Sequence, residues 1–186
     1  IKQLALELGY QPDPMLSALA GYRNSKLNPS IHSAVAWINA WPKPQLLRSH
    51  REFDYYWKGA HAAALKFGYR LEEFHLNSQC SPQRLHQILQ ARGIRGILLP
   101  PHRVQPNWED FPWSEYSIVR FGRSMSEPLS HLVTADHVAN TLLAFRKVRE
   151  RGYRRIGLAI NESTIQKIGH YFEGGYLMAQ RMVEER

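Results

Sequence analysis

The spacing of apolar residues divides the chain into a short helical start and a longer alternating part. Apolar residues recur with helical spacing in residues 1–8 and again in 15–20. Between these segments, Asp13 suits an N-cap and Pro14 suits the first turn of a helix, so the pattern predicts two short helices. The stretch 22–30 that follows is polar, and we place a domain boundary there.

Beyond residue 30, apolar runs of strand length alternate with amphipathic segments. Strands are predicted at residues 33–38, 69–76, 96–99, 117–121, 132–134 and 155–160, and helices at 49–67, 81–92, 136–151 and 164–185. This alternation predicts the α/β class, with a doubly wound parallel sheet covered by helices on both faces. Ligands bind such sheets at the carboxyl ends of the strands, so a site is expected in those loops.

The composition is that of an ordinary globular protein, with 44% hydrophobic and 22% charged residues. Cys80 is the only cysteine, which excludes a disulfide within the chain and fits a cytoplasmic protein. No apolar stretch is long enough to span a bilayer, so we expect no membrane partner. The net charge of +8 favours nucleic acid as a partner, although the densest basic run, 146–155, is typical of a solvated helix face.

The common enzyme motifs are absent from the sequence. The loop 39–44 after the first predicted strand has neither G-x-G-x-x-G nor the P-loop pattern, and the chain has no H-E-x-x-H and no G-x-S-x-G. The nine histidines are scattered, so we predict no metal site and no cofactor. We therefore expect a binding protein without catalytic residues.

Polar and aromatic residues gather in the loops at the predicted carboxyl ends of the strands. The candidate ligand contacts are Asn39, Trp41, Pro100, His102, Arg123 and Asp136. An aromatic ring among polar groups suits a small polar ligand, because the ring can stack on the apolar face of a sugar or a base. The same residues are equally compatible with loops that only cap the sheet.

The predicted helix in residues 12–21 is too short to be stable alone in water. Its apolar residues Met15, Leu16 and Leu19 have no domain of their own. It is a leader segment without structure, or a helix packed on a neighbour, or a helix that folds when it binds a partner.

Several phrases of the sequence resemble the LacI/GalR family of bacterial transcription regulators. Glu7-Leu8-Gly9-Tyr10-Gln11-Pro12-Asp13, followed by Leu19-Ala20-Gly21, is similar to the end of the family's DNA-binding headpiece and its hinge helix. Val133-Thr134-Ala135-Asp136 and Arg151-Gly152-Tyr153-Arg154-Arg155-Ile156-Gly157 resemble the family's V-x-x-D-N and R-G-H-R-x-I-G phrases. The phrases follow one another in the family's order along the whole chain.

The resemblance implies a division of the chain into three segments. Residues 1–30 would be the end of the headpiece and the hinge helix, 31–152 a periplasmic-binding-protein-like N-terminal lobe, and 153–186 the start of a second, incomplete lobe. A small-molecule effector, a sugar or a related polar metabolite, would bind between the lobes.

The resemblance also implies operator DNA as a partner and a homodimer as the binding form. In the family, paired hinge helices enter the minor groove and a leucine wedges between base pairs, which kinks the duplex. By the resemblance this wedge is Leu19. The residues expected at the DNA are Tyr10, Ser17, Ala18, Leu19 and Ala20.

Some positions depart from the family's pattern. Pro14 and Met15 replace the usual polar and aliphatic pair, and Ala18 stands where Arg or Gln is expected, which leaves the base preference open. Phe172, which we add to the candidate effector contacts, stands where the family has an arginine, and His137 stands where Asn is common. Without an arginine that forks onto sugar hydroxyls, a less typical effector or weak sugar binding is expected.

Two functions of different classes follow from these observations. The first is a DNA-binding transcriptional regulator, a repressor, controlled by an effector. The alternative is a periplasmic-type solute-binding protein or a sensor domain of the same fold, which would need a signal peptide and would have no use for residues 10–21. An α/β enzyme is a third interpretation that lacks a catalytic constellation.

Overall fold

The computed structural model describes residues 33–184. The strands in this range are β1 (Ser33–Asn39), β2 (Tyr69–His75), β3 (Gly96–Leu99), β4 (Ser117–Phe121) and β5 (His131–Val133). The helices are α3 (Arg51–Lys66), α4 (Pro82–Ala91), α5 (His137–Glu150), α6 (Glu162–Ile168) and α7 (Tyr171–Glu184), with 3-10 turns at Pro44–Leu46 and Trp113–Glu115. None of these helices is both long enough and apolar enough to cross a membrane.

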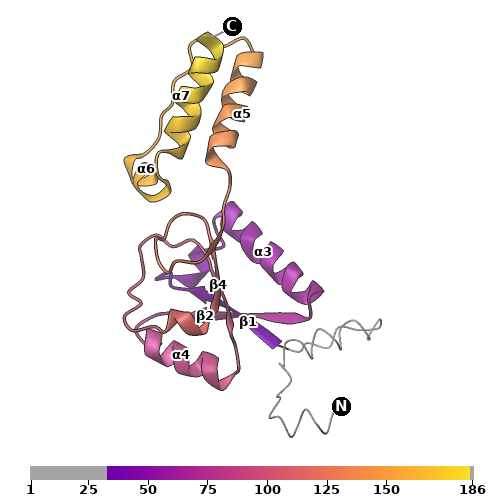
Figure 1. Cartoon of the computed structure of the whole chain (residues 1–186), viewed down its shortest axis with the longest axis vertical. Coiled ribbons are helices and arrows are strands. Elements are labelled where there is room, and N and C mark those ends of the chain that lie inside the picture. Colours follow the sequence, from indigo (N-terminus) through magenta and orange to yellow (C-terminus); the bar gives the residue numbers. More distant parts are fainter. Residues whose placement is uncertain (1–32, 185–186) are drawn as a thin grey trace, which may run out of the picture.

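The five described strands form one sheet in the order β2-β1-β3-β4-β5, and every neighbouring pair is parallel. The chain passes from β1 through α3 to β2 on one side, then through α4 to β3 on the other side (Figure 1). The predicted α/β class with a parallel sheet is therefore confirmed. The strand order reverses between β1 and β3, and ligands of such sheets bind at the carboxyl ends of the two strands where this happens.

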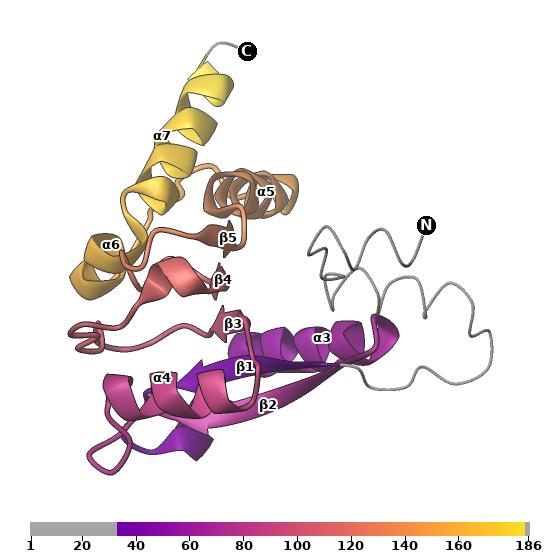
Figure 2. The same cartoon turned by 60° about the horizontal axis from the view of Figure 1, so that its bottom comes forward.

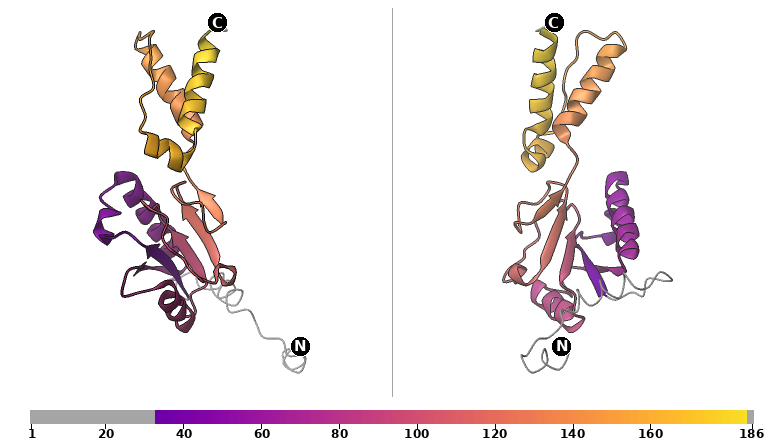
Figure 3. Two further views of the ribbon diagram at one scale, coloured as in Figure 1. Left: turned by 90° about the vertical axis from the view of Figure 1, so that its left-hand side faces the viewer. Right: turned by 45° about the vertical axis from the view of Figure 1, so that its right-hand side comes forward.

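Alternate residues of the inner strand β1 are buried against different helices. Ile38 packs with Leu85 and Leu89 of α4, whereas the ring centroid of Trp37 lies 5.3 Å from that of Trp57 in α3. The two helices lie on opposite faces of the sheet (Figure 3). Since side chains alternate along a strand, this two-sided burial explains why β1 is an almost continuous apolar run.

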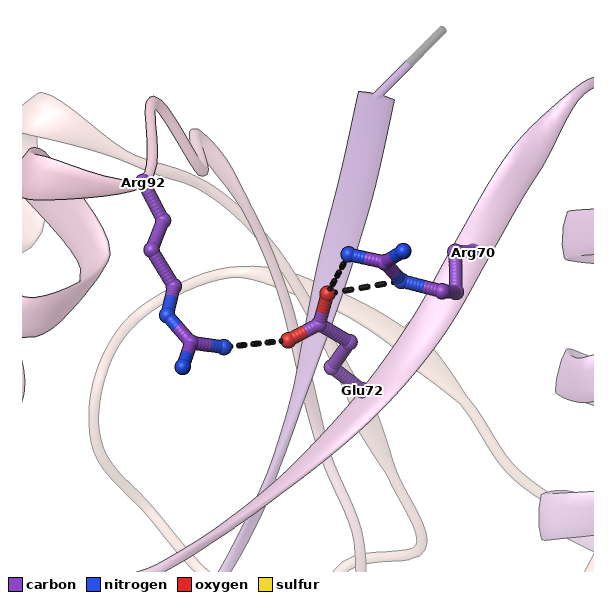
Figure 4. Close-up of polar contacts among 3 residues, drawn as sticks. All are labelled: Arg70, Glu72 and Arg92. Carbon is purple, nitrogen blue, oxygen red and sulfur yellow. Dashed lines mark hydrogen bonds and ion pairs between the residues drawn. The ribbon is translucent and has the colours of Figure 1, made fainter. Parts of the chain in front are cut away.

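The edge strand β2 carries a cluster of charged side chains. Glu72 lies between Arg70, on the same strand, and Arg92, which follows α4 (Figure 4). Nη1 of Arg92 is 2.6 Å from Oε2 of Glu72. Both arginines are largely exposed, so each ion pair contributes at most about 1 kcal/mol to stability. Charges on an edge strand also disfavour pairing with a strand of another molecule.

α5 packs against α7, beyond the β5 edge of the sheet (Figures 1 and 2). Thr141 of α5 and Ala179 of α7 are buried. Phe145 and Tyr176 meet edge to face with ring centroids 5.9 Å apart, and the Tyr176 hydroxyl donates to the carbonyl oxygen of Ile156 at 2.7 Å. Tyr176 therefore joins the two helices to the segment that runs between them.

Two expectations for the C-terminal region were wrong. Residues 155–160 are not a strand, because no described strand offers backbone partners to this apolar run. The helix expected over 164–185 is instead two helices, α6 and α7, separated at Gly169, whose φ of 82° is a left-handed conformation that glycine adopts readily. The domain boundary at residue 152 remains a sequence prediction, although α5 lies with the elements that follow it.

Gly175→Ala is expected to destabilise the contact between α5 and α7. A Cβ at Gly175 would lie 2.9 Å from both Cβ of Thr141 and the carbonyl oxygen of Val138. Backbone cannot yield as a flexible side chain does, so we expect a loss of about 1–3 kcal/mol in the free energy of unfolding. Chemical denaturation measures it.

Gly174→Ala is the matched control, because a Cβ there would meet nothing within 4 Å. Alanine is favoured over glycine inside a helix, so this variant should be unchanged or more stable by up to about 1 kcal/mol. Equal stability of the two variants would contradict close packing at Gly175.

Candidate functional site

The loops that follow β1 and β3 are joined by direct hydrogen bonds. The backbone N–H of Ala40 donates to Nε2 of His102 at 2.9 Å. Nε1 of Trp41 donates to the carbonyl oxygen of Pro101 at 2.8 Å. Trp41 and His102 are only 4% and 3% exposed, so these bonds lie inside the protein and fix the two loops relative to one another.

Asn39 is a positioning residue for the first of these loops. Its Nδ2 donates to Oε1 of Glu73 at 3.0 Å and to the carbonyl oxygen of Pro44 at 3.1 Å. Its Oδ1 accepts from the backbone N–H of Trp41 at 3.0 Å. Glu73 is paired in addition with Arg48. Because both polar atoms of this fully buried side chain have partners, Asn39 acts here by holding the loop.

His102 is a neutral, buried imidazole. Burial lowers its pKa to about 4, because it disfavours the charged ring, and the backbone carbonyl of Pro100 opposes this effect. Since Nε2 accepts from Ala40, the proton of the neutral ring lies on Nδ1, which is shielded from solvent and has no hydrogen bond of good geometry within residues 33–184. Pro100 itself is completely buried.

The loop after β4 lies against the loop after β3. The backbone N–H of His102 donates to Oγ of Ser124 at 3.0 Å. Gly122 has a φ of 71°, and a Cβ there would come within 3.2 Å of Cγ of Pro101. A residue without a side chain thus allows the approach, and the loops after β1, β3 and β4 form one continuous edge.

Two arginines at this edge lie over aromatic rings. The guanidinium carbon of Arg123 is 4.3 Å from the ring centroid of Tyr171, at the start of α7. The guanidinium carbon of Arg103 is 5.4 Å from the ring centroid of Trp41. The first contact links the β4 loop to the α5–α7 pair, and the second covers the buried tryptophan.

Asp136 and Phe172 belong to the α5–α7 pair. Oδ1 of the exposed Asp136 accepts from the backbone N–H of Ala139 at 2.9 Å and caps α5. The ring of Phe172 lies 4.7 Å from that of His137, centroid to centroid. These two predicted contacts therefore reach the rest of the site through the Arg123–Tyr171 contact.

The structure brings together five of the seven predicted effector residues, namely Asn39, Trp41, Pro100, His102 and Arg123. Their role in effector binding remains a prediction, as does that of Asp136 and Phe172. The sequence analysis missed Arg103, Ser124 and Tyr171. Arg103 directly follows His102 in the sequence, but only tertiary structure shows that it lies over Trp41.

The predicted DNA contacts lie outside the described residues. They are Tyr10, Ser17, Ala18, Leu19 and Ala20, and the whole segment 1–30, predicted to hold the headpiece end and hinge helix, lies outside as well.

Within residues 33–184, no three His, Cys, Asp or Glu side chains are grouped so that they could hold a metal ion.

A groove of about 670 Å³ lies between α5 and α7. Its lining is mainly apolar and includes Leu142, Leu143, Phe145 and Met182. Arg146, Arg149 and Glu150 also line it, but none of the predicted effector residues does, so we do not assign the effector site to it.

No protein-family model matches the chain, and no curated protein matches it. Among solved structures, it is similar to the transcriptional regulator CelR in its cellobiose complex, with a TM-score of 0.56, 21% identity, and coverage of 98% of this chain and 51% of that chain. It is also similar to a LacI transcriptional regulator from a Rhodococcus species, with a TM-score of 0.53, 18% identity, and coverage of 81% and 53%. The trehalose repressor from Escherichia coli gives a TM-score of 0.51, 17% identity, and coverage of 82% and 56%.

These likenesses show the fold. The α/β lobe has the periplasmic-binding-protein-like fold of LacI-family regulators, which confirms the fold implied by the sequence resemblance. The chain spans about half the length of the structures that it matches.

His102→Gln is expected to reduce the loss of stability in acid. The pKa of His102 is lowered from 6.5 to about 4 in the folded protein, so the unfolded chain binds its proton first as the pH falls. The resulting stability is complete above pH 6.5 and is lost as the pH falls from there towards 4, by about 2 kcal/mol between pH 7.5 and pH 5. Glutamine does not titrate and can still accept from Ala40.

Urea unfolding of both proteins at the two pH values measures this difference. His131→Gln is the control, because it removes an exposed histidine at the β5 edge. If His102→Gln loses as much stability in acid as the unaltered chain, burial of His102 is not the cause.

Proposed function

We propose that the chain belongs to a LacI/GalR-type transcriptional regulator, a repressor that binds operator DNA under the control of a small-molecule effector. The observation that carries this proposal is the combination of two features. The described lobe has the fold of LacI-family regulators, and residues 7–21 before it resemble their headpiece end and hinge helix. On this proposal the chain acts by binding and not as an enzyme.

The effector would bind at the edge formed by the loops after β1, β3 and β4. The hydrogen bonds of Trp41 and His102 pre-organise this edge, so a ligand need not order it. CelR is described in complex with cellobiose, and by analogy we propose a sugar or a related polar metabolite here. Asp136 and Phe172 would contact it from the α5–α7 side.

Effector binding would act through the Arg123–Tyr171 contact, which links the β4 loop to α7. A ligand that prefers one relative position of the sheet and the helices shifts the population towards it. In a homodimer, that shift would change the distance between the two hinge segments and thus their fit to DNA. The protein would act in the cytoplasm and needs no cofactor for this function.

The fold would equally suit a solute-binding protein. Residues 10–21 favour the regulator, because a solute receptor has no use for a hinge helix with a leucine wedge. We propose Leu19 as the wedge, flanked by Ala18 and Ala20, with Tyr10 and Ser17 at the DNA backbone.

Leu19→Ala in the intact protein is expected to weaken specific operator binding on the order of tenfold or more, because the smaller side chain cannot unstack a base step. An operator is first selected from random duplexes with the unaltered protein. Fluorescence anisotropy then compares the affinities of the two proteins at one salt concentration.

Leu27→Ala is the matched control, since it makes the same chemical change in the polar stretch after the predicted hinge. It should bind the operator as the unaltered protein does. An unchanged affinity of Leu19→Ala would sink the wedge assignment, and failure to select any sequence would sink the regulator proposal.

A further inference from the structure

Arg103 and Arg123 lack a carboxylate partner among residues 33–184. Arg48, at the same edge of the sheet, differs from them because it is paired with Glu73. An arginine without an acidic partner is ordinary on an open surface. Two of them in touching loops of a candidate ligand site concentrate positive charge where a ligand would lie.

The two arginines come from loops that are bonded to one another. The backbone N–H of His102, next to Arg103, donates to Oγ of Ser124, next to Arg123, at 3.0 Å. The strands that precede these loops, β3 and β4, are parallel neighbours in the sheet. Both positive charges therefore belong to one short section of the carboxyl edge.

Aromatic rings hold the two guanidinium groups. Arg103 lies over Trp41 and Arg123 over Tyr171, at 5.4 and 4.3 Å from the ring centroids. A guanidinium that rests on a ring keeps N–H donors at its rim, in the fork geometry that matches a carboxylate or a phosphate. The rings thus attract the guanidinium groups and leave their N–H donors free to bind a ligand.

Arg123 is the stronger of the two observations. It is half-buried, and its Nε is shielded from solvent without a hydrogen-bond partner in the described region of the chain. A buried donor on a charged group is costly when it is unpaired. A ligand that supplies an acceptor would remove this cost.

Two acids of the α5–α7 pair, Asp136 and Glu173, have other partners. Oδ1 of Asp136 accepts from the N–H of Ala139 at the start of α5. Glu173, two residues after Tyr171, is paired with His170. Neither acid forms an ion pair with Arg103 or Arg123, and the exposed Glu127 of the β4 loop forms none with them either.

We propose that the effector carries an oxyanion, as a phosphate ester or a carboxylate on a polyhydroxy compound, and that Arg103 and Arg123 bind it. The inference rests on the proposed effector site and names its ligand class. The oxyanion would lie against the two guanidinium rims, and the hydroxyl-bearing portion would extend from there over the edge. Because Arg123 also contacts Tyr171 of α7, binding of an anion to Arg123 would change the contact between the sheet and the helices.

The probes are inorganic phosphate and gluconate, with neutral glucose for comparison. Each is titrated into the 186-residue chain, and the thermal unfolding midpoint is compared with that in sodium chloride of equal ionic strength, since a ligand of the folded state raises it by mass action. We expect stabilisation by at least one of the two anions beyond that given by glucose. Phosphate alone would identify a phosphate ester and gluconate alone a sugar acid.

Arg103→Gln and Arg123→Gln should each weaken the effective anion about tenfold, because each removes a charge-assisted pair. Arg103 is exposed and makes no hydrogen bond among those found in the structure, so its variant is expected to fold even if Arg123→Gln is impaired. Arg146→Gln, which alters an exposed arginine of α5, should bind the anion as before.

The proposal is overturned if neither anion stabilises the chain more than sodium chloride does, or if glucose stabilises it as much as the anions do. It is also overturned if Arg103→Gln and Arg123→Gln bind the anion no more weakly than Arg146→Gln does. These results would leave the regulator proposal standing, because the operator selection tests DNA binding without any effector.

Discussion

The two-sided burial of β1 is the constraint on which the rest of the structure depends. Trp37 faces α3 and Ile38 faces α4, so the strand must lie inside the sheet with a helix on each face. A parallel strand in this position sends its loop to the same edge as the loops of its neighbours. The meeting of Trp41 with Pro101, and of Ala40 with His102, follows from that placement.

At this edge, the residues that hold the loops in place differ from those proposed to bind the ligand. Trp41 and His102 use polar atoms to bond one loop to another, and Asn39 holds the loop to which it belongs. All three are almost completely buried. Arg103 and Arg123 lie further out and keep unused donors. Buried bonds of this kind hold a binding surface in shape before the ligand arrives, which lowers the entropic cost of binding.

The hydrophobic pattern of the sequence predicted the helices and strands well, but it predicted poorly which of them pair with one another. All five strands of the sheet, and the helices α3, α4 and α5, were predicted to within a few residues, because their periodicity is imposed by burial. The run 155–160 has the same apolar pattern but no partner strand among the described residues, and Gly169 divides a helix that periodicity alone would continue. Pairing and chain reversal depend on neighbours that a local window does not contain.

The sequence by itself determined the α/β class, the parallel sheet and the loops in which a site had to lie, since these follow from hydrophobic spacing and from the geometry of crossovers. Tertiary structure decided what each loop residue does. It turned Asn39 and His102 inward as acceptors and donors for the backbone, and it placed Arg103 over Trp41. Residue type indicates which bonds a side chain can make, whereas the partners come from distant regions of the chain that only folding brings within hydrogen-bond distance.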